Sequence, residues 1–220
     1  MEADVIGRTI AMLALLAGMG AQPAIAQGAS DAPAGNYALD LAHGRLLFRV
    51  NHLGFSRYTA LFTRFDAALV FDPAAPESMS VTATVDTASL ETHYPDASFD
   101  FNAILTGPDF LDAAAFPQIT FASTAVKQTG PQTADVTGDL TLRGVTKPVT
   151  LNVTFNGGYA GHPLDAGARI GFSAEGSLLR SDFGLTAGIP APGTTMGVGD
   201  RVEVMIEAEF LNPDAPKVLE

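Results

Sequence analysis

Hydrophobic and polar residues alternate along most of this chain, most clearly at residues 136–155. Apolar side chains take nearly every second position on both sides of a turn that contains Gly144 and Pro148, and mostly threonine, aspartate or asparagine lies between them. Alternation with a period of two gives a strand one dry face and one wet face. The segment therefore predicts two antiparallel strands joined by a tight turn.

The same alternation recurs elsewhere and predicts eight strands, most of them separated by turn-forming residues. Their expected ranges are 37–52, 58–72, 78–86, 118–127, 134–142, 147–156, 168–179 and 200–210. Within the second range the apolar residues change parity at Thr63 and Arg64, which indicates a bulge. The chain is predicted to be all-β.

Residues 87–117 depart from the strand pattern. Residues 109–115 (DFLDAAA) resemble a short helix that begins after Gly107 and Pro108 and ends before Pro117. We therefore expect a short helical insertion near 107–115.

The first 26 residues are typical of a signal peptide, because a short apolar stretch is followed by a small-x-small site at 24–26. The apolar stretch is shorter than the roughly 20 residues that a membrane-spanning helix needs. We expect cleavage near Ala26, one barrel domain at 27–211 and a flexible tail at 212–220 that contains two prolines. A buried N-terminal helix is the alternative for the leader.

Composition excludes several classes of function. The net charge of −12 repels nucleic acid and anionic lipid headgroups. The chain has no cysteine, which excludes disulfides, a thiol nucleophile and a thiolate metal site. Its four histidines show no paired spacing of metal ligands, and no nucleophile elbow precedes a serine. We therefore predict no metal site and no catalytic residue, and hence no enzyme.

Eight long antiparallel strands leave two unpaired edges, which closure into a barrel removes. Strands tilted by about 40° close at a radius on the order of 8 Å, which medium side chains nearly fill. The inward positions mix small residues (Val81, Ala83, Val85, Ala174, Ala208) with large ones (Phe48, Phe62, Phe121, Phe172, Phe210). A barrel with a narrow apolar slot and a barrel filled by its own side chains satisfy this pattern equally.

Seven short motifs then occur in one order: F-x-V-x-H-x-G-F-S (48–56), SLET (89–92), DFLD (109–112), FP (116–117), GDLTLRGVTKPV (138–149), RSDFG (180–184) and VGD-x-V (198–202). In this order the chain resembles the YceI-like family of polyisoprenoid-binding proteins. The resemblance implies a lipocalin-like, eight-stranded antiparallel barrel that holds a long amphiphile, such as an isoprenoid quinone or a fatty amide. It also implies a periplasmic location and no cofactor chemistry.

We predict a set of ligand-binding residues from strand parity and chain position. The lining is expected to contain Phe48, Val50, Phe62, Val81, Val85, Phe121, Leu140, Leu151, Phe172, Phe183, Val204 and Ile206. His52, Arg180 and Asp182 are the candidates for headgroup contacts at the mouth. As alternatives, the phenylalanines are ordinary core, Arg180 pairs with Asp182 across a turn, and His52 is a hydrogen-bonded inner or rim histidine.

The leading hypothesis is an exported carrier, located in the periplasm, whose partner is a long-chain hydrophobic small molecule. We expect no nucleic-acid partner and no stable membrane insertion, and a homodimer is compatible with the pattern. A structural or interaction module with a self-filled barrel is the first alternative. An outer-membrane barrel, which would need an apolar outer face and a polar lumen, is the second.

Overall fold

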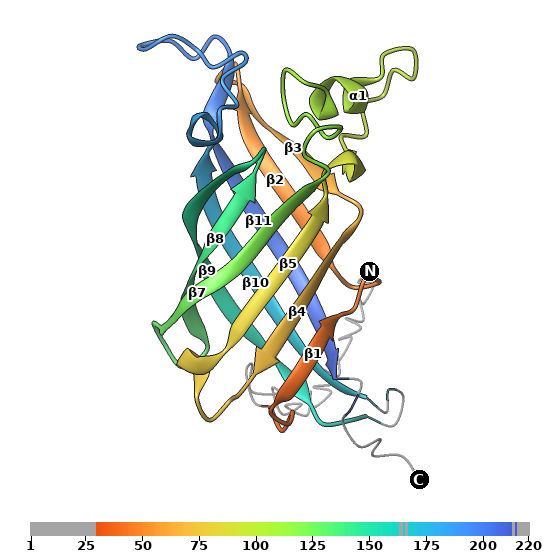
Figure 1. Cartoon of the computed structure of the whole chain (residues 1–220), viewed down its shortest axis with the longest axis vertical. Coiled ribbons are helices and arrows are strands. Elements are labelled where there is room, and N and C mark those ends of the chain that lie inside the picture. Colours follow the sequence, from red (N-terminus) through yellow and green to blue (C-terminus); the bar gives the residue numbers. More distant parts are fainter. Residues whose placement is uncertain (1–29, 163–164, 166, 213, 215–220) are drawn as a thin grey trace, which may run out of the picture.

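The predicted strands form a closed antiparallel barrel in the computed structural model of this protein (Figure 1). The structure describes residues 30–162, 165, 167–212 and 214, so the predicted leader at 1–26 lies outside the described residues. The strands are β1 (Gly35–Leu39), β2 (Arg45–His52), β3 (Ser56–Phe62), β4 (Phe65–Phe71), β5 (Ser80–Asp86), β6 (Leu90–Glu91), β7 (Gln118–Gln128), β8 (Thr133–Leu142), β9 (Val145–Tyr159), β10 (Ala168–Leu179) and β11 (Val198–Asn212). One α-helix, α1 (Phe101–Thr106), and the 3-10 helices η1 (Pro76–Ser78), η2 (Thr87–Ser89) and η3 (Arg180–Phe183) complete the described elements.

These strands fill eight places in the barrel. The sheet runs β1-β4-β5-β7-β8-β9-β10-β11-β2-β3-β6, and β1 also pairs with β11, which closes it. Strands β1 and β2 share one place because both pair with β11, β1 at residues 210–211 and β2 at residues 198–207. Strands β3 and β4 share the next place, since they pair with β2 and β1 respectively. The predicted eight-stranded barrel is therefore confirmed.

The first predicted strand, 37–52, is interrupted at residues 40–44. Asp40 causes the interruption, because its Oδ1 accepts the backbone N–H of Ala42 at 3.0 Å and its carbonyl accepts that of His43 at 3.0 Å. Aspartate side chains commonly stabilise such local turns against strand pairing. The prediction of one continuous strand was wrong here, although both pieces pair with β11.

The change of parity predicted at Thr63 and Arg64 is confirmed, but it is a break and not the predicted bulge, and it divides the predicted strand 58–72 into β3 and β4. The buried Ser89 of η2 holds this break: its carbonyl accepts the Thr63 N–H at 3.0 Å, and its hydroxyl accepts the Arg64 N–H at 3.1 Å. The apolar side chains of β3 and of β4 can therefore both face the interior.

The helical insertion lies at a different place from the predicted 107–115. Asp100 caps α1 by accepting the N–H of Ala103 at 2.9 Å, and the helix ends at Thr106. Pro108 disfavours a helical conformation in the residue before it, so Gly107 and Pro108 end the helix instead of beginning one. Residues 107–115 form successive turns, which include a positive φ of 49° at Asp112.

The hairpin of β8 and β9 shows how the alternating pattern builds the wall. Arg143 and Gly144 both have positive φ, 51° and 73°, as a tight two-residue hairpin requires. On the outer face, the Thr137 hydroxyl lies 2.8 Å from that of Thr150. The opposite parity, which includes Leu140, faces the interior.

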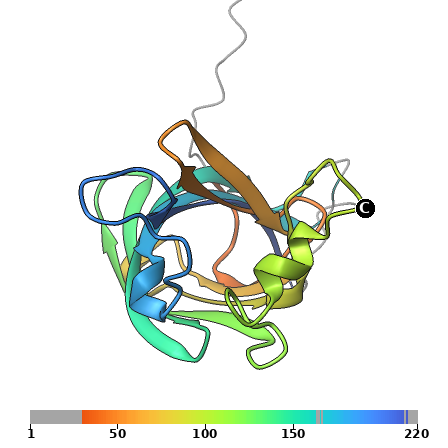
Figure 2. The same ribbon diagram turned by 90° about the horizontal axis from the view of Figure 1, so that it is seen from above.

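The two ends of the barrel differ. At the upper end in Figure 1, residues 87–117 carry α1, and Figure 2 shows that α1 and the connection between η3 and β11 lie over opposite sides of that end. The lower end carries the β4–β5, β7–β8 and β9–β10 connections. Strand β11 extends to the buried Asn212, so it includes the first residue of the predicted tail.

Candidate functional site: an apolar cavity along the barrel

A cavity of about 1050 Å³ occupies the interior. Its wall includes His52 and Tyr94 at the upper end and Pro76 and Pro131 at the lower end, so the space follows the length of the barrel. Small-molecule sites usually have volumes of about 300–1000 Å³. The barrel is therefore not filled by its own side chains, which is contrary to the first alternative.

Most of the predicted ligand-binding residues lie on this cavity. The lining contains Phe48, Val50, His52, Phe62, Val81, Val85, Phe121, Leu140, Leu151, Phe172, Arg180, Val204 and Ile206. Asp182 and Phe183 are not among the described lining residues: Asp182 is exposed, and Phe183 is buried beside Leu142 and Leu185. Both residues belong to the short helix η3, which follows β10, so strand parity does not set the direction of their side chains.

Two inward glycines help to keep the lumen open. A Cβ at Gly138 would lie 2.7 Å from Cε2 of Phe121, and a Cβ at Gly176 would lie 2.6 Å from Cδ2 of Leu151. Both large side chains therefore occupy space beside the wall that a neighbouring side chain would otherwise take. The small inward residues that the sequence indicated also line the cavity.

Aromatic rings lie along the wall at two levels. In the lower half, the ring centroids of Phe155 and Phe172 are 5.2 Å apart. The ring centroid of Phe172 also lies 6.1 Å from that of Phe210. Nearer the upper end, the rings of Phe48 and Phe62 are 5.7 Å apart. Edge and tilted ring contacts of this kind stabilise packing beyond the buried area alone. The rings thus form an ordered apolar wall.

Arg180 is buried at the upper end, where its hydrogen bonds join the segment after η3 to the start of β11; we call this arrangement the Arg180 clamp. Its guanidinium donates to the carbonyls of Gly199 (2.9 Å), Leu185 (3.0 Å), Ala187 (2.8 Å) and Val198 (2.8 Å). Burial lowers the pKa of this guanidinium, and the charge of Asp200 partly offsets the effect. The alternative that Arg180 pairs with Asp182 was wrong, since none of its described bonds involves Asp182.

Sequence reasoning missed a group of lining residues in the segment that carries α1. Tyr94, Phe101, Leu105, Phe110 and Leu111 all line the upper part of the cavity. The Phe101 ring also contacts Tyr58, with centroids 5.9 Å apart. The signal was the density of aromatic residues at 94–101, but a segment without regular alternation does not reveal which side chains face inward.

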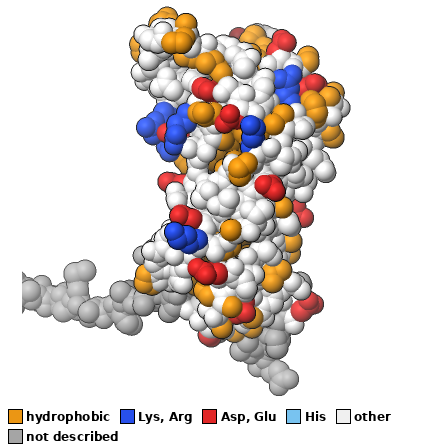
Figure 3. Space-filling view, turned by 60° about the vertical axis from the view of Figure 1, so that its left-hand side comes forward, with side chains coloured by type: hydrophobic (Ala, Val, Ile, Leu, Met, Phe, Trp, Pro, Cys, Tyr) orange, Lys and Arg blue, Asp and Glu red, His pale blue; other side chains and the backbone are white. Residues whose placement is uncertain are grey.

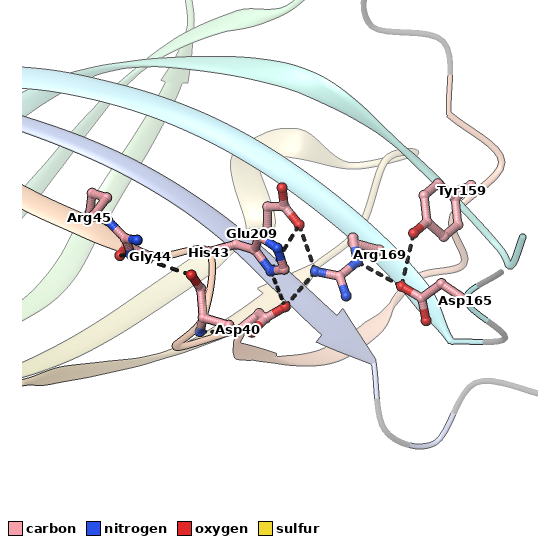
Figure 4. Close-up of polar contacts among 9 residues, drawn as sticks. Asp40, His43, Gly44, Arg45, Tyr159, Asp165, Arg169 and Glu209 are labelled. Atoms are coloured by element: carbon pink, nitrogen blue, oxygen red, sulfur yellow. Dashed lines mark hydrogen bonds and ion pairs between the residues drawn. The ribbon is translucent and has the colours of Figure 1, made fainter.

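One polar cluster has the composition of a metal site. Ligand atoms of Asp40, His43 and Glu209 lie within 4.8 Å of one another. The Arg169 guanidinium already lies between the two carboxylates, with Nη1 2.6 Å from Asp40 and 2.6 Å from Glu209, and its Nε is 2.9 Å from Asp165 (Figure 4). The arrangement is an ion-pair network that joins the β1–β2 turn to β10 and β11, where the barrel closes.

This network shifts the pKa values of its members. Hydrogen bonds from Arg169 and then His43 lower the pKa of Asp40 from 3.8 to about 2. Burial acts to lower the pKa of Arg169, but hydrogen bonds to Asp40, Asp165 and Glu209 raise it above its ordinary value. The network therefore favours the charged forms of both the Asp40 carboxylate and the Arg169 guanidinium.

The cavity wall is mostly apolar, whereas the outer surface carries many charged side chains. Charged side chains of both signs are scattered over the face drawn in Figure 3. A small outer pocket contains Arg49, Arg57, Arg201 and Glu203. This distribution is the reverse of that expected for an outer-membrane barrel. Separately, no described helix has the length and hydropathy to cross a membrane.

Comparisons with known proteins agree with this architecture. A UPF0312 protein of Pseudomonas savastanoi pv. phaseolicola is 41% identical over 169 residues, which cover 76% of this chain and 83% of the relative. The crystal structure of Burkholderia cenocepacia BcnA has a TM-score of 0.64 and 28% identity, and the match covers 78% of this chain and 98% of BcnA. A Campylobacter jejuni YCEI protein has a TM-score of 0.62 and 28% identity, over 74% of this chain and 90% of that protein.

A polyisoprenoid binding domain from Saccharophagus degradans shares the fold, with a TM-score of 0.55 and 18% identity over 80% of this chain and 98% of the domain. Residues 37–210 match the YceI-like domain, and this range extends from β1 to β11. The resemblance indicated by the seven motifs is thereby confirmed. The chain belongs to the YceI-like family.

Proposed function

We propose that this protein is a non-enzymatic carrier that holds a long-chain amphiphile inside its barrel. Isoprenoids, isoprenoid quinones and fatty-acyl amides are the ligand classes that we consider. One observation carries the proposal: the cavity of about 1050 Å³ follows the barrel axis and is walled almost entirely by apolar side chains. An extended hydrocarbon chain fits the length and the chemistry of this space.

The expected affinity comes mainly from the chain. Each buried methylene contributes about 0.8 kcal/mol, so ten contribute about 8 kcal/mol before the cost of ordering the ligand. Polar contacts at the ends of the cavity would add a smaller amount and would set the orientation. Chain length should therefore control binding more strongly than the headgroup does.

The polar groups near the cavity support binding and not catalysis. The Ser181 hydroxyl donates to Asp200 at 2.7 Å, but Ser181 is not among the described lining residues and so does not present a nucleophile to a ligand in the cavity. His52 lies exposed at the rim, at the end of β2. We also propose export to the periplasm, a proposal that rests on the leader pattern at 1–26.

Native mass spectrometry of the purified protein, followed by extraction with organic solvent, tests the proposal. We expect a mass above that of the polypeptide by one bound molecule, and we expect extraction to release a long-chain amphiphile. A protein that is empty and also fails to bind added prenyl quinones and fatty amides would contradict the carrier function.

A further inference from the structure

We infer that the upper end of the barrel docks on a phospholipid bilayer that contains anionic lipids. The docking surface consists of two connections, which we call the apolar tip (residues 53–55 and 184–197), and of Arg49, Arg57 and Arg201 on the outer wall beside it. The inference deepens the proposed carrier function, on which it rests, because docking would bring the cavity mouth to the bilayer that supplies or receives a long-chain ligand. The contact is peripheral and reversible.

Large hydrophobic side chains are exposed mainly at the upper end. Among the described residues, eight large hydrophobic side chains are exposed, and six belong to this end: Phe55, Tyr94, Phe99, Ile104, Leu179 and Met196. The two most exposed are in the apolar tip, where Phe55 is 83% exposed and Met196 is 68% exposed. Single exposed hydrophobic residues are common, but a group of them at one end indicates an interaction surface.

The two connections of the apolar tip form one unit. The Leu53 N–H donates to the carbonyl of Gly197 at 2.9 Å. A Cβ at Gly54 would lie 2.9 Å from Oγ1 of Thr195, so the two connections are in close contact. Residues 184–199 contain no charged side chain. The two most exposed hydrophobic side chains therefore belong to a single uncharged projection.

The apolar tip adjoins the mouth of the cavity. Leu185 lies within the tip, and His52 and Val198 directly flank it in the sequence; all three line the cavity. The connection between η3 and β11 lies on one side of the upper end, opposite α1 (Figure 2). A hydrocarbon chain would therefore pass between a bilayer at the tip and the cavity with little exposure to water.

Three arginines lie on the outer wall beside the apolar tip. Arg49, Arg57 and Arg201 line a small pocket together with Glu175 and Glu203. Arg49 Nε and Arg57 Nη1 share one oxygen of Glu203, at 3.3 Å and 3.4 Å. Neither Arg49 Nε nor this oxygen makes a hydrogen bond within the described structure, and no described hydrogen bond or ion pair involves the Arg201 side chain. These guanidinium groups are therefore available to an anion outside the protein.

The spacing between the tip and the arginines matches the depth of a headgroup layer. Arg57 follows Phe55 by two residues, which corresponds to a rise of about 7 Å along a strand. Interfacial segments bury their apolar side chains about 5–10 Å into the boundary between headgroups and acyl chains. When Phe55 contacts acyl chains, Arg57 would therefore lie at the level of the phosphates, which guanidinium groups bind with charge-assisted hydrogen bonds.

A bilayer fits this surface better than a second protein does. Two buried large side chains remove on the order of 400 Å² from water, about half of what each partner contributes to a stable protein interface. A fluid bilayer needs no complementary shape. The five carboxylates of residues 87–117, on the side of α1, would repel anionic lipids, as would the net charge of −12. Docking should therefore be oriented with the arginines toward the headgroups, and salt should weaken it.

Flotation with vesicles tests the inference on the purified full chain. Vesicles of equal parts phosphatidylcholine and phosphatidylglycerol are compared with vesicles of phosphatidylcholine alone. We expect binding to the mixed vesicles, and we expect Phe55→Ser combined with Met196→Ser to weaken it by about tenfold or more, because two apolar side chains are lost. Leu41→Ser is the matched control: Leu41 is 63% exposed, but it lies in the turn between β1 and β2, away from the tip, so binding should persist.

A second pair of variants tests the role of the arginines. An arginine near an anionic surface contributes about fivefold in affinity, so Arg201→Gln should weaken binding to the mixed vesicles by about that factor. Binding to phosphatidylcholine alone should not change. Lys127→Gln removes the same charge from β7 near the lower end and should leave both affinities unchanged.

The outcomes separate this inference from the carrier function. A protein that retains a long-chain amphiphile in native mass spectrometry but does not float with the mixed vesicles would overturn the docking and leave the carrier function intact. Equal binding by the Phe55→Ser, Met196→Ser double variant and by Leu41→Ser would overturn the apolar tip as the site. Self-association that only the double variant abolishes, without vesicle binding, would show that the tip contacts a second copy and would also overturn the inference.

Discussion

The ring of Phe121 on β7 occupies the space that a side chain at Gly138 on β8 would take. A Cβ at Gly138 would lie 2.7 Å from Cε2 of the ring and 2.6 Å from the carbonyl oxygen of Ala122. We therefore expect Gly138→Ala to lower the free energy of unfolding by roughly 1–3 kcal/mol, the usual cost of overpacking. Urea unfolding followed by circular dichroism measures the change.

A second strand glycine provides the control for this variant. A Cβ at Gly171 would meet only Cβ of Asn156, at 3.8 Å. Gly171→Ala should therefore leave the free energy of unfolding within about 0.5 kcal/mol of the parent value or raise it slightly. If Gly138→Ala and Gly171→Ala unfold alike, the proposed packing of Phe121 is incorrect.

A larger side chain at Val204 should shorten the usable cavity. Val204 lines the lumen, so Val204→Phe would obstruct long chains more than short ones. Exclusion of about two methylenes weakens binding of a long ligand by roughly tenfold. Titration of short and long fatty amides into the variant measures the difference.

The next residue on β11 is a matched control. Met205 has the opposite parity and belongs to the small outer pocket, so Met205→Phe should preserve the affinity for every chain length. An equal loss for short and long ligands in Val204→Phe would argue against an internal site.

Strand parity predicted the barrel and most of its lining because long paired strands impose a strict inward and outward alternation. Val81 and Val204, which are far apart in the sequence, were both placed on the inner face, and both line the cavity. The alternation did not reveal whether space remains between the walls. Whether a cavity remains depends on Gly138 and Gly176, because these glycines leave room beside the wall for the large side chains of Phe121 and Leu151.

Arg180 should be more important for stability than for chain binding. Lysine has one ammonium group in place of the planar guanidinium, so Arg180→Lys would leave some of the four carbonyls without donors. We expect a loss of roughly 2–4 kcal/mol in the free energy of unfolding, measured by chemical denaturation. Arg201→Lys, at an exposed position of β11, is the control and should change stability little. Similar stability of Arg180→Lys and the parent protein would refute the clamp.

The ion-pair network where the barrel closes should make stability depend on pH in the acidic range. The pKa of Asp40 is lowered from 3.8 to about 2, mainly by Arg169, so the folded state favours its charged form. The stabilisation is complete above the unfolded value and is lost as the pH falls from about 4 through about 2. The side chain of Asp40 is only 14% exposed, and the shift corresponds to roughly 2 kcal/mol.

Asp40→Asn isolates this contribution. Its free energy of unfolding should be lower than that of the parent protein at pH 7, and the difference should shrink toward zero near pH 2. Asp139→Asn changes an exposed carboxylate on the outer face of β8 and serves as the control. A difference between Asp40→Asn and the parent that stays constant from pH 7 to pH 2 would contradict the assignment.

The parts that the sequence did not predict depend on side-chain contacts between distant segments. Asp100 and Pro108 set the limits of α1, and the residues between them gave no periodic signal that would separate a helix from a turn. Arg180 was identified as a mouth residue, but its four carbonyl partners lie up to 19 residues away along the chain. Such contacts follow from the completed fold and not from local alternation.

Binding measured across a homologous series of neutral ligands tests the central claim most directly. Primary fatty amides from about 10 to about 24 carbons should bind the delipidated protein with an affinity that rises by roughly fourfold per methylene until the cavity is filled. Beyond that length the affinity should stop rising. An affinity that is independent of chain length, or an absence of binding throughout the series, would contradict an internal apolar site.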